Sequence, residues 1–281
     1  MAETAFLVKY RDEWIQGFER LPTVLRSTVT TDAMVNGRQA VFLIANSARE
    51  ATTRGSNGLI PASADDLTQV TLTLTEAHDL SRKTGYNIFA GQADQRAVMQ
   101  AQGRNVINRK IDDVIITELD TATVTFTGGV MSKGVASKAR TLLGNAEVPI
   151  DDRLFFAVTP AQWAHLENDP SFASADYVEM KPLVNGMPNP QAPSITVRRW
   201  ANFNWFTHTG LPGKGTSTAK CFAYHSSAIG YCYNNGDVQV AVGYDKEQDY
   251  SYARHTIYHG AKKLQTAGII EVTVDDTGYS A

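Results

Sequence analysis

The sequence predicts an α+β fold in which a projecting β-hairpin is followed by one very long helix. Two β-type runs, at residues 38–46 and 70–75, flank a long polar loop at residues 47–66. A helical pattern without proline then covers residues 94–119, and most later segments have the character of short strands between turns. A hairpin with so long a loop buries little of its own surface, so we expect it to lie on another molecule.

The second strand of this hairpin alternates strictly, with Val70, Leu72 and Leu74 separated by threonines. A period of two predicts a strand with one buried face, and β-branched threonine suits the pleated surface of a sheet. The loop at residues 47–66 exceeds the roughly 12–15 residues beyond which loops in compact domains are mostly functional or disordered. An ordinary surface insertion without a partner is the alternative interpretation.

Residues 94–119 predict a single helix of about 39 Å, because each helical residue adds about 1.5 Å. Three or four turns are typical of globular proteins, so this helix is unusually long. The apolar residues near one stripe are Ala97, Ala101, Ile107, Ile111, Val114, Ile115 and Leu119, and Gly103 is the one glycine. A second helix is predicted over residues 132–143, with a solvated basic face.

The N-terminal residues predict a short amphipathic helix. Trp14, Phe18 and Leu21 follow the i, i+4, i+7 spacing of one helical face. Pro22 ends the pattern, because proline lacks the backbone N–H group and disfavours helix at the preceding residue. We expect this arm to pack on its own domain or on a neighbour.

The chain after Pro149 predicts a β-rich unit with one short helix. The expected strands cover residues 153–159, 195–209, 220–224, 252–260 and 269–274, and the expected helix covers residues 160–166. A segment rich in Pro, Gly and Asn at residues 182–193 and a turn at residues 234–237 interrupt them.

The charge balance argues against a protein whose main task is to grip nucleic acid. The 281-residue chain has 26 Lys and Arg residues against 29 Asp and Glu residues, a formal net charge of -3. Proteins that neutralise phosphates usually carry a strong basic excess. A container that encloses nucleic acid without gripping it is compatible with this balance.

The two cysteines, Cys221 and Cys232, form no CxxC pattern and have the character of small buried apolar residues in a reducing compartment. The sequence leaves open whether they pair. The N-terminus lacks the basic and apolar segments of a signal peptide. No apolar stretch approaches the roughly 20 residues that span a bilayer, so we expect a cytosolic product without membrane contact.

The motifs that invite a phosphate-binding or metal-binding interpretation fail in their details. In the segment 210–216 (GLPGKGT), Gly215 follows Lys214 where a phosphate-binding loop requires Ser or Thr, and we expect a flexible hairpin tip. His255 and His259 have the i, i+4 spacing of a helical metal site, but the residues around them favour a strand.

No residue cluster predicts catalysis. His225 stands beside Ser226 and Ser227 but lacks the Gly-x-Ser-x-Gly setting of a nucleophile. The adjacent carboxylates at residues 151–152 and 275–276 are expected to be solvated. The sequence therefore predicts a protein that is not an enzyme, with no catalytic, metal-binding or cofactor-binding residues.

The order of these elements resembles that of the HK97-fold major capsid proteins of tailed bacteriophages. Residues 223–230 (AYHSSAIG), 253–264 (ARHTIYHGAKKL) and 269–272 (IIEV) look like the C-terminal third of such proteins. The resemblance implies an N-terminal arm at residues 1–32, an extended E-loop hairpin at 33–86, a peripheral domain at 87–150 and 236–281 with a spine helix at 94–119, and an axial domain at 151–235.

The resemblance also implies a function. The chain would self-assemble into hexamers and pentamers of an icosahedral shell around the phage dsDNA genome, without sequence-specific binding of the DNA. Its partners would be other copies of itself, a portal protein and a separate scaffolding protein, with a decoration protein left open. The shell would be assembled in the host bacterial cytoplasm and the protein would reside in the virion.

Intersubunit contacts are expected from the E-loop and the N-terminal arm. The E-loop residues are Arg49, Glu50, Arg54, Asn57 and Asp65, and the arm residues are Trp14 and Phe18. Some relatives cross-link subunits through a Lys–Asn bond, but the loop offers no lysine, so we expect a non-covalent shell. Because the arm and hairpin start almost at Met1, a fused scaffolding segment is not expected.

Other interpretations share parts of this pattern. An encapsulin-like bacterial compartment would use the same fold around an enzyme cargo. Another virion protein, such as a tail-tube or decoration protein, would lack the long helix. A hydrolase that uses His225 or Ser226 has the least support.

Overall fold

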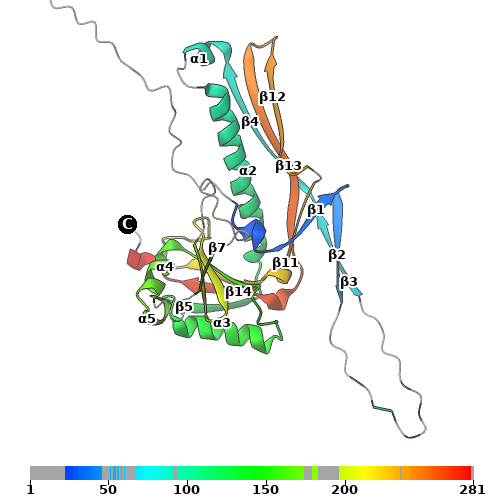
Figure 1. The fold of residues 1–281 in the computed structure, drawn as a ribbon, viewed down its shortest axis with the longest axis vertical. Coiled ribbons are helices and arrows are strands. Elements are labelled where there is room, and N and C mark those ends of the chain that lie inside the picture. Colours follow the sequence, from blue (N-terminus) through cyan, green and yellow to red (C-terminus); the bar gives the residue numbers. More distant parts are fainter. Residues whose placement is uncertain are drawn as a thin grey trace, which may run out of the picture.

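The computed structural model describes residues 23–45, 51, 53–54, 56, 58, 60, 67–90, 94–173, 179–182, 196–234 and 236–279. Within these residues the chain forms a compact body around a large sheet and an elongated unit, in which one long helix lies along a second sheet (Figure 1). A two-stranded hairpin projects from the region where the two meet (Figure 1).

The long helix α2 spans Gln95–Leu119, which confirms the predicted helix. Asp94 caps its first turn, because its Oδ1 accepts hydrogen bonds from the backbone N–H groups of Arg96 and Ala97. Much of the predicted stripe is buried, namely Ile107, Ile111, Ile115 and Leu119. Ala97, also in that stripe, is exposed.

The second sheet contains β1 (Thr30–Val35), β4 (Thr75–Thr84), β11 (Ile229–Asn234), β12 (Gln239–Asp245) and β13 (Tyr250–Lys263). One edge of β13 pairs with β4, and the other pairs first with β12 and then with β11, which pairs in parallel with β1. Helix α2 packs on β13 and β4, and the short α1 (Gly85–Ala90) follows β4. The odd-numbered residues from Ser251 to His259 are buried on the α2 side, whereas even-numbered residues face away.

The compact body contains a seven-stranded sheet in the order β5-β14-β10-β6-β9-β8-β7. Its strands are β5 (Val124–Gly129), β6 (Leu154–Val158), β7 (Glu179–Pro182), β8 (Thr196–Trp200), β9 (Phe203–Thr207), β10 (Ala219–His225) and β14 (Ile269–Val274). The helices α3 (Lys133–Asn145), α4 (Pro160–Glu167) and α5 (Pro170–Ala173) lie around it (Figure 1). The two predicted helices and the predicted strands of this region are confirmed, except that the β-segment expected at residues 195–209 forms two antiparallel strands, β8 and β9.

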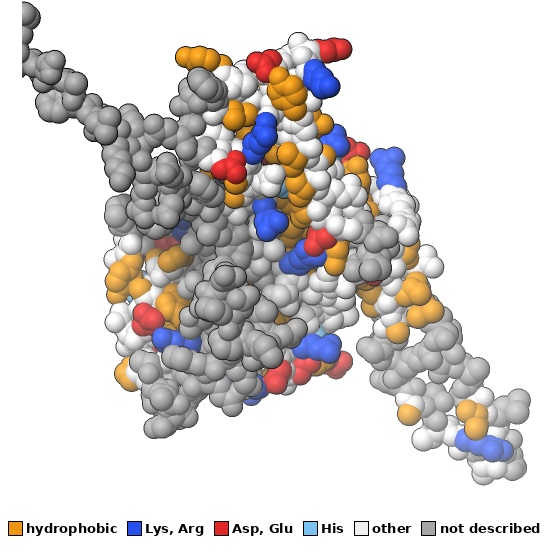
Figure 2. Space-filling view, turned by 45° about the horizontal axis from the view of Figure 1, so that its top comes forward, with side chains coloured by type: hydrophobic (Ala, Val, Ile, Leu, Met, Phe, Trp, Pro, Cys, Tyr) orange, Lys and Arg blue, Asp and Glu red, His pale blue; other side chains and the backbone are white. Residues whose placement is uncertain are grey.

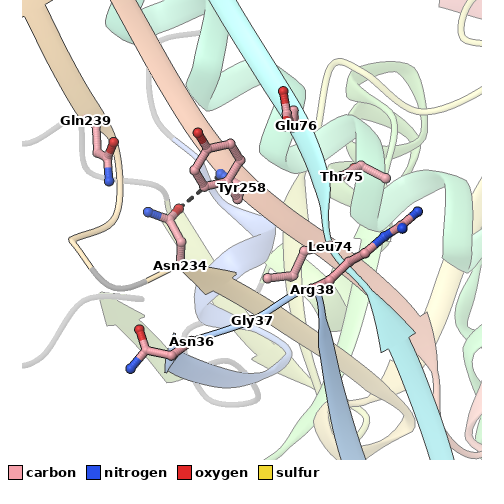
Figure 3. Close-up of a pocket in the computed structure, with 9 residues that line it drawn as sticks. All are labelled: Asn36, Gly37, Arg38, Leu74, Thr75, Glu76, Asn234, Gln239 and Tyr258. Atoms are coloured by element: carbon pink, nitrogen blue, oxygen red, sulfur yellow. Dashed lines mark hydrogen bonds between the residues drawn. The ribbon is translucent and has the colours of Figure 1, made fainter.

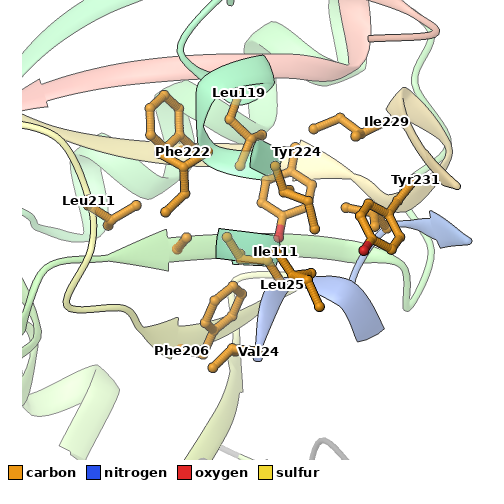
Figure 4. Packing of buried hydrophobic residues seen from close by; sticks show 14 of the residues in the cluster. Val24, Leu25, Ile111, Leu119, Phe206, Leu211, Phe222, Tyr224, Ile229 and Tyr231 are labelled. Atoms are coloured by element: carbon orange, nitrogen blue, oxygen red, sulfur yellow. The ribbon is translucent and has the colours of Figure 1, made fainter. Parts of the chain in front are cut away.

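Two large apolar clusters hold these parts together. One joins α2 to both sheets and includes Leu25, Ile111 and Tyr224 (Figure 4). The other fills the compact body, where the rings of Phe156 and Trp205 stack with centroids 4.1 Å apart. Helix α2 is therefore the element that fixes the elongated unit to the body.

The projecting hairpin consists of β2 (Gln39–Ala45) and β3 (Leu67–Thr73). The two strands pair in antiparallel register throughout, from Gln39 opposite Thr73 to Ala45 opposite Leu67. Strand pairing stops at Leu74, after which the chain continues as β4 in the second sheet. The alternating run that begins at Val70 therefore continues from one sheet into another.

The sheets do not follow the domain boundaries that the sequence suggested. Strand β4, expected in the E-loop hairpin, pairs with β13 from Thr75 to Thr84. Strands β5 and β14 were expected in the peripheral domain but lie in the seven-stranded sheet, whereas β11, expected in the axial domain, lies in the second sheet. Long-range pairing decides these places, and the local pattern of a strand does not specify its partner.

The segment 210–216 is not a hairpin tip, because β6 lies between β9 and β10, the two strands that it connects. The backbone N–H group of Gly215 donates to Oδ2 of Asp276 at 3.1 Å. Oδ1 of Asp276 accepts from Thr159 Oγ1 at 2.9 Å and from Gln162 Nε2 at 2.8 Å. Asp276 is thus buried with three donors around it, not solvated as the sequence suggested.

Candidate interaction surfaces

The face of the second sheet that turns away from α2 carries three adjoining cavities, which we call the outer groove. Their volumes are about 810, 210 and 230 Å³. The first and second share Gln239 and Tyr258, and the second and third share Ala241 and Arg254, so they form one depression along the sheet. The largest cavity opens beside the base of the hairpin, where the backbone N–H group of Tyr258 donates to Asn234 Oδ1 at 3.0 Å (Figure 3).

Strand register explains why the outer groove is both aromatic and basic. Tyr252 stands opposite Arg82 of β4 and Gly243 of β12, and paired residues point to the same face of a sheet. A Cβ atom on Gly243 would lie 2.6 Å from the Tyr252 hydroxyl oxygen, so this glycine leaves room for the ring. The Arg82 guanidinium carbon lies 4.9 Å from the centre of the Tyr250 ring, within range of a cation–π contact.

A second exposed surface lies on β12, on the side of the sheet that carries α2. Val240, Val242 and Tyr244 are each about half exposed, at 48%, 50% and 50%. They point to the same side of the sheet as the buried residues of β13. Because α2 packs on β13 and β4, these side chains of β12 stay exposed. Figure 2 shows hydrophobic side chains exposed among charged ones along the elongated unit.

The hairpin exposes apolar side chains as well. Val41 is 52% exposed, Leu43 is 63% exposed and Leu67 is 58% exposed. The register places these three on one face of the two-stranded sheet, together with Thr71 and Gln69. Exposed apolar surface framed by polar residues is typical of a site that binds another protein.

The structure describes one of the seven residues for which intersubunit contacts were predicted. Arg54 lies exposed in the hairpin loop, and its Nε donates to the carbonyl oxygen of Gly58 at 2.7 Å. Arg49, Glu50, Asn57 and Asp65 of the loop and Trp14 and Phe18 of the arm lie outside the described residues. The contact expected of Arg54 with another subunit stays a prediction.

The sequence did not reveal the residues of the outer groove or the exposed residues Val240, Val242 and Tyr244 of β12. Alternation at residues 239–245 (QVAVGYD) was the available signal for β12, because apolar residues there recur at every second position. Arg82 and Tyr252 give no local signal. They meet because β4 and β13, far apart in the sequence, pair with each other.

His225, which the sequence places beside Ser226 and Ser227 without a nucleophile motif, forms hydrogen bonds with Ser227 and Asp151. His225 Nε2 lies 3.1 Å from Asp151 Oδ1, and His225 Nδ1 lies 2.7 Å from Ser227 Oγ. The backbone N–H group of Ser227 also donates to Nδ1, at 3.2 Å. The imidazole therefore caps the short turn Ser226–Ala228 and ties it to Asp151.

His255, His259 and both cysteines are buried. His255 and His259 lie in strand β13, as predicted, and burial together with the charges of Lys110 and Arg26 lowers the pKa of His259 to about 4. Cys221 and Cys232 are free thiols in different strands. Across the described part of the chain, no group of three His, Cys, Asp or Glu residues is placed to hold a metal ion. No helix in that part has both the length and the apolarity needed to cross a bilayer.

Comparisons with known proteins agree with this architecture. The sequence model of a family described as phage capsid protein matches residues 2–276. No curated protein matches the chain.

Among solved structures, three similar chains each align over nearly their full length. The capsid of Ralstonia phage GP4 has a TM-score of 0.72 at 11% identity, covering 97% of this chain and 96% of that chain. The capsid of a native GTA particle has a TM-score of 0.71 at 12% identity, with coverages of 97% and 96%. A structure of Mycobacterium phage Che8 has a TM-score of 0.70 at 16% identity, with coverages of 96% and 98%. These likenesses establish the fold.

Proposed function

Because this chain belongs to the phage capsid protein family, we propose that its copies build the virion shell as hexamers and pentamers that enclose dsDNA. It is a structural capsid protein with the HK97-like fold of phage capsids, and not an enzyme. The family does not favour the compartment-shell alternative. The net charge of -3 suits a container that holds DNA without binding a particular sequence.

In this proposal, the elongated unit of α2 and the second sheet is the peripheral part of the subunit, and the seven-stranded body is the axial part. The axial part would lie nearest the axis of each hexamer or pentamer. A portal protein and a separate scaffolding protein are the further partners that we propose, with assembly in the host cytoplasm. A decoration protein bound outside the shell stays open.

The hairpin is the element that we propose to join neighbouring subunits. Its exposed face, with Val41, Leu43 and Leu67, and the outer groove are both uncovered in the single chain. A hairpin of one subunit laid along the outer groove of the next would bury both surfaces at once. The exposed apolar face of the hairpin is the observation that carries this proposal.

Charged loop residues would add to this contact. The loop residues that we propose to contact a neighbouring subunit are Arg49, Glu50, Arg54, Asn57 and Asp65. Trp14 and Phe18 of the arm are proposed to do the same. A single exposed ion pair contributes about 0–1 kcal/mol, but a closed shell repeats it in every subunit. We propose that these contacts are non-covalent, so purified particles should dissociate to single chains on a denaturing gel.

The experiment that tests this function replaces residues 47–66 with a short turn. The expected variant is folded by circular dichroism but forms no closed shells in negative-stain electron microscopy. A control variant keeps the loop length with a Gly/Ser sequence and separates the reach of the hairpin from its side chains. Normal particles from the shortened variant would overturn the role of the hairpin.

The cargo is tested separately. Particles purified from infected cells and treated with nuclease should retain protected dsDNA. Particles that instead retain a protein cargo would support the compartment alternative.

A further inference from the structure

The hairpin rests on a seat formed by two glycines of the second sheet. Gly230 in β11 and Gly260 in β13 lie on the face opposite α2. Cys232 lies on the same face, two residues after Gly230 in β11 and opposite Gly260 in β13. Atoms of the hairpin fill the space above the two glycines, and the closest to a Cβ atom on Gly260 would be the Thr73 carbonyl oxygen at 3.0 Å. A Cβ atom on Gly230 would lie 2.7 Å from the ring of Phe42, and one on Gly260 would lie 3.2 Å from Leu72 Cδ2.

The contact is small and separate from the main cores. Ala40, Leu72 and Cys232 form a cluster of their own, with Phe42 and Leu74 packed at its margin. Neither of the two large clusters includes a residue of β2 or β3. The hairpin can therefore separate from the sheet without opening either large core.

The hairpin connects to the rest of the subunit at its base, through Gly37 on one strand and Leu74 on the other. Gly37 has a φ of +126°, and nothing lies within 4 Å of where its Cβ would be. On the other strand, pairing breaks at Leu74, whose N–H group donates to the carbonyl oxygen of Arg38 at 2.9 Å. Gly37 and Leu74 both line the largest of the three cavities, so the two connections of the hairpin lie close together (Figure 3).

We propose that Gly230 and Gly260 position the hairpin, and that the hairpin leaves this seat as a unit by rotating about Gly37 and Leu74. A glycine is required at Gly230 because any side chain there meets the Phe42 ring. The seat sets the angle at which the hairpin leaves its own subunit. An effect of this angle on shell closure rests on the proposed function, whereas the seat and the hinge do not.

The two native cysteines report on this motion. Cys232 is fully buried beneath the hairpin, and Cys221 is fully buried in the seven-stranded sheet. Burial raises the pKa of Cys232 to about 11 and that of Cys221 to about 12. Because a thiolate is the reactive form, neither thiol should react until its surroundings open. Cys221 is therefore an internal control for global unfolding.

The test measures thiol labelling of unassembled subunits, with each site resolved by peptide mass spectrometry. In the wild type, Cys232 should react at least tenfold faster than Cys221. Gly230→Ala should raise the rate at Cys232 about tenfold further and leave Cys221 unchanged. Adding Phe42→Leu to Gly230→Ala should restore the slower rate, because it removes the ring atoms that the new methyl group meets.

A second variant covers the case in which Gly230→Ala does not fold. Phe42→Ala empties the seat without adding a clash, and it should also raise the rate at Cys232 alone. Equal rates at the two cysteines in the wild type and in Phe42→Ala would overturn the hinge. Because no shell is needed, the result is independent of whether the loop deletion blocks assembly.

Discussion

His208 Nε2 donates a hydrogen bond to Asp112 Oδ2 at 3.1 Å, and both side chains are buried. Nδ1 of the same ring accepts from the backbone N–H group of Gly210 at 3.1 Å, which fixes the proton on Nε2. Asp112 Oδ1 accepts from Thr23 Oγ1 at 2.8 Å and from Leu25 N at 3.3 Å. One carboxylate of the long helix thus holds the first described residues of the chain and a loop of the compact body.

Replacing Asp112 should therefore cost more stability than any exposed charge. Asp112→Ala leaves buried donors without an acceptor, and we expect a loss of about 3–5 kcal/mol in the free energy of unfolding. Asp112→Asn keeps one acceptor and should lose less. Chemical denaturation of unassembled subunits measures both. Asp113→Asn, a change at an exposed neighbour on α2, is the control. A loss below about 1 kcal/mol in Asp112→Ala would contradict the role of Asp112 in connecting these segments.

A single methyl group on α2 should disturb its packing on β13. A Cβ atom on Gly103 would lie 2.1 Å from His255 Nδ1, so Gly103→Ala should destabilise the fold by about 1–3 kcal/mol despite the better helix propensity of alanine. Gly134→Ala in α3 is the matched control, since its nearest neighbour, Ser132 Oγ, would lie 3.8 Å away. Thermal unfolding of the two variants should shift in opposite directions or leave the control unchanged. Full rescue of Gly103→Ala by His255→Ala would identify the clash.

Acid should weaken the contact between α2 and the second sheet. Burial, then the charges of Lys110 and Arg26, lowers the pKa of His259 from 6.5 to about 4. Below pH 6.5 the unfolded chain binds a proton that the folded chain refuses, so stability is lost as the pH falls from 6.5 to about 4. A shift of this size corresponds to about 3 kcal/mol.

The pH dependence is measured as the unfolding free energy of unassembled subunits at several pH values. His259→Gln should flatten the curve between pH 6.5 and pH 4, relative to wild type. His255, whose pKa burial also lowers, contributes in the same direction, so some slope remains. An unchanged slope in His259→Gln would show that other groups cause the acid sensitivity.

The outer groove should matter for assembly rather than folding. Arg254 lines two of its three cavities, and Arg254→Glu reverses the charge on which a neighbour would dock. We expect normal circular dichroism and at least a tenfold lower yield of closed particles. Arg140→Glu, on the exposed side of α3, makes the same charge change elsewhere and should assemble normally. Equal yields from the two variants would exclude the groove from the contact.

The sequence was most informative where a local pattern determines an element. The helix at Gln95–Leu119 and the strand Ile269–Val274 were predicted from periodicity and turn residues. What it could not give is which strands pair. Asp112 lies outside the apolar stripe predicted for the helix, yet it is buried. Its burial depends on donors from Thr23 and His208, which lie far away in the sequence.

The same limit applies to the interaction surfaces. The long loop drew attention to the hairpin, but the outer groove exists only because Arg82 and Tyr252 meet across β4 and β13. The glycines of the seat gave no indication of their role in the sequence. Gly230 and Gly260 look like ordinary strand glycines until the hairpin lies over them.

The exposed face of the hairpin has a consequence for the life of a newly made subunit. Before a neighbour arrives, Val41, Leu43 and Leu67 face water on a strand pair, a surface prone to aggregate. Shell growth and precipitation then compete for the same free subunits, so the outcome depends on the rates of the two processes and on the concentration of free subunits. A cell that makes the chain faster than shells nucleate would accumulate insoluble protein, and solubility in vivo would follow expression level rather than fold stability.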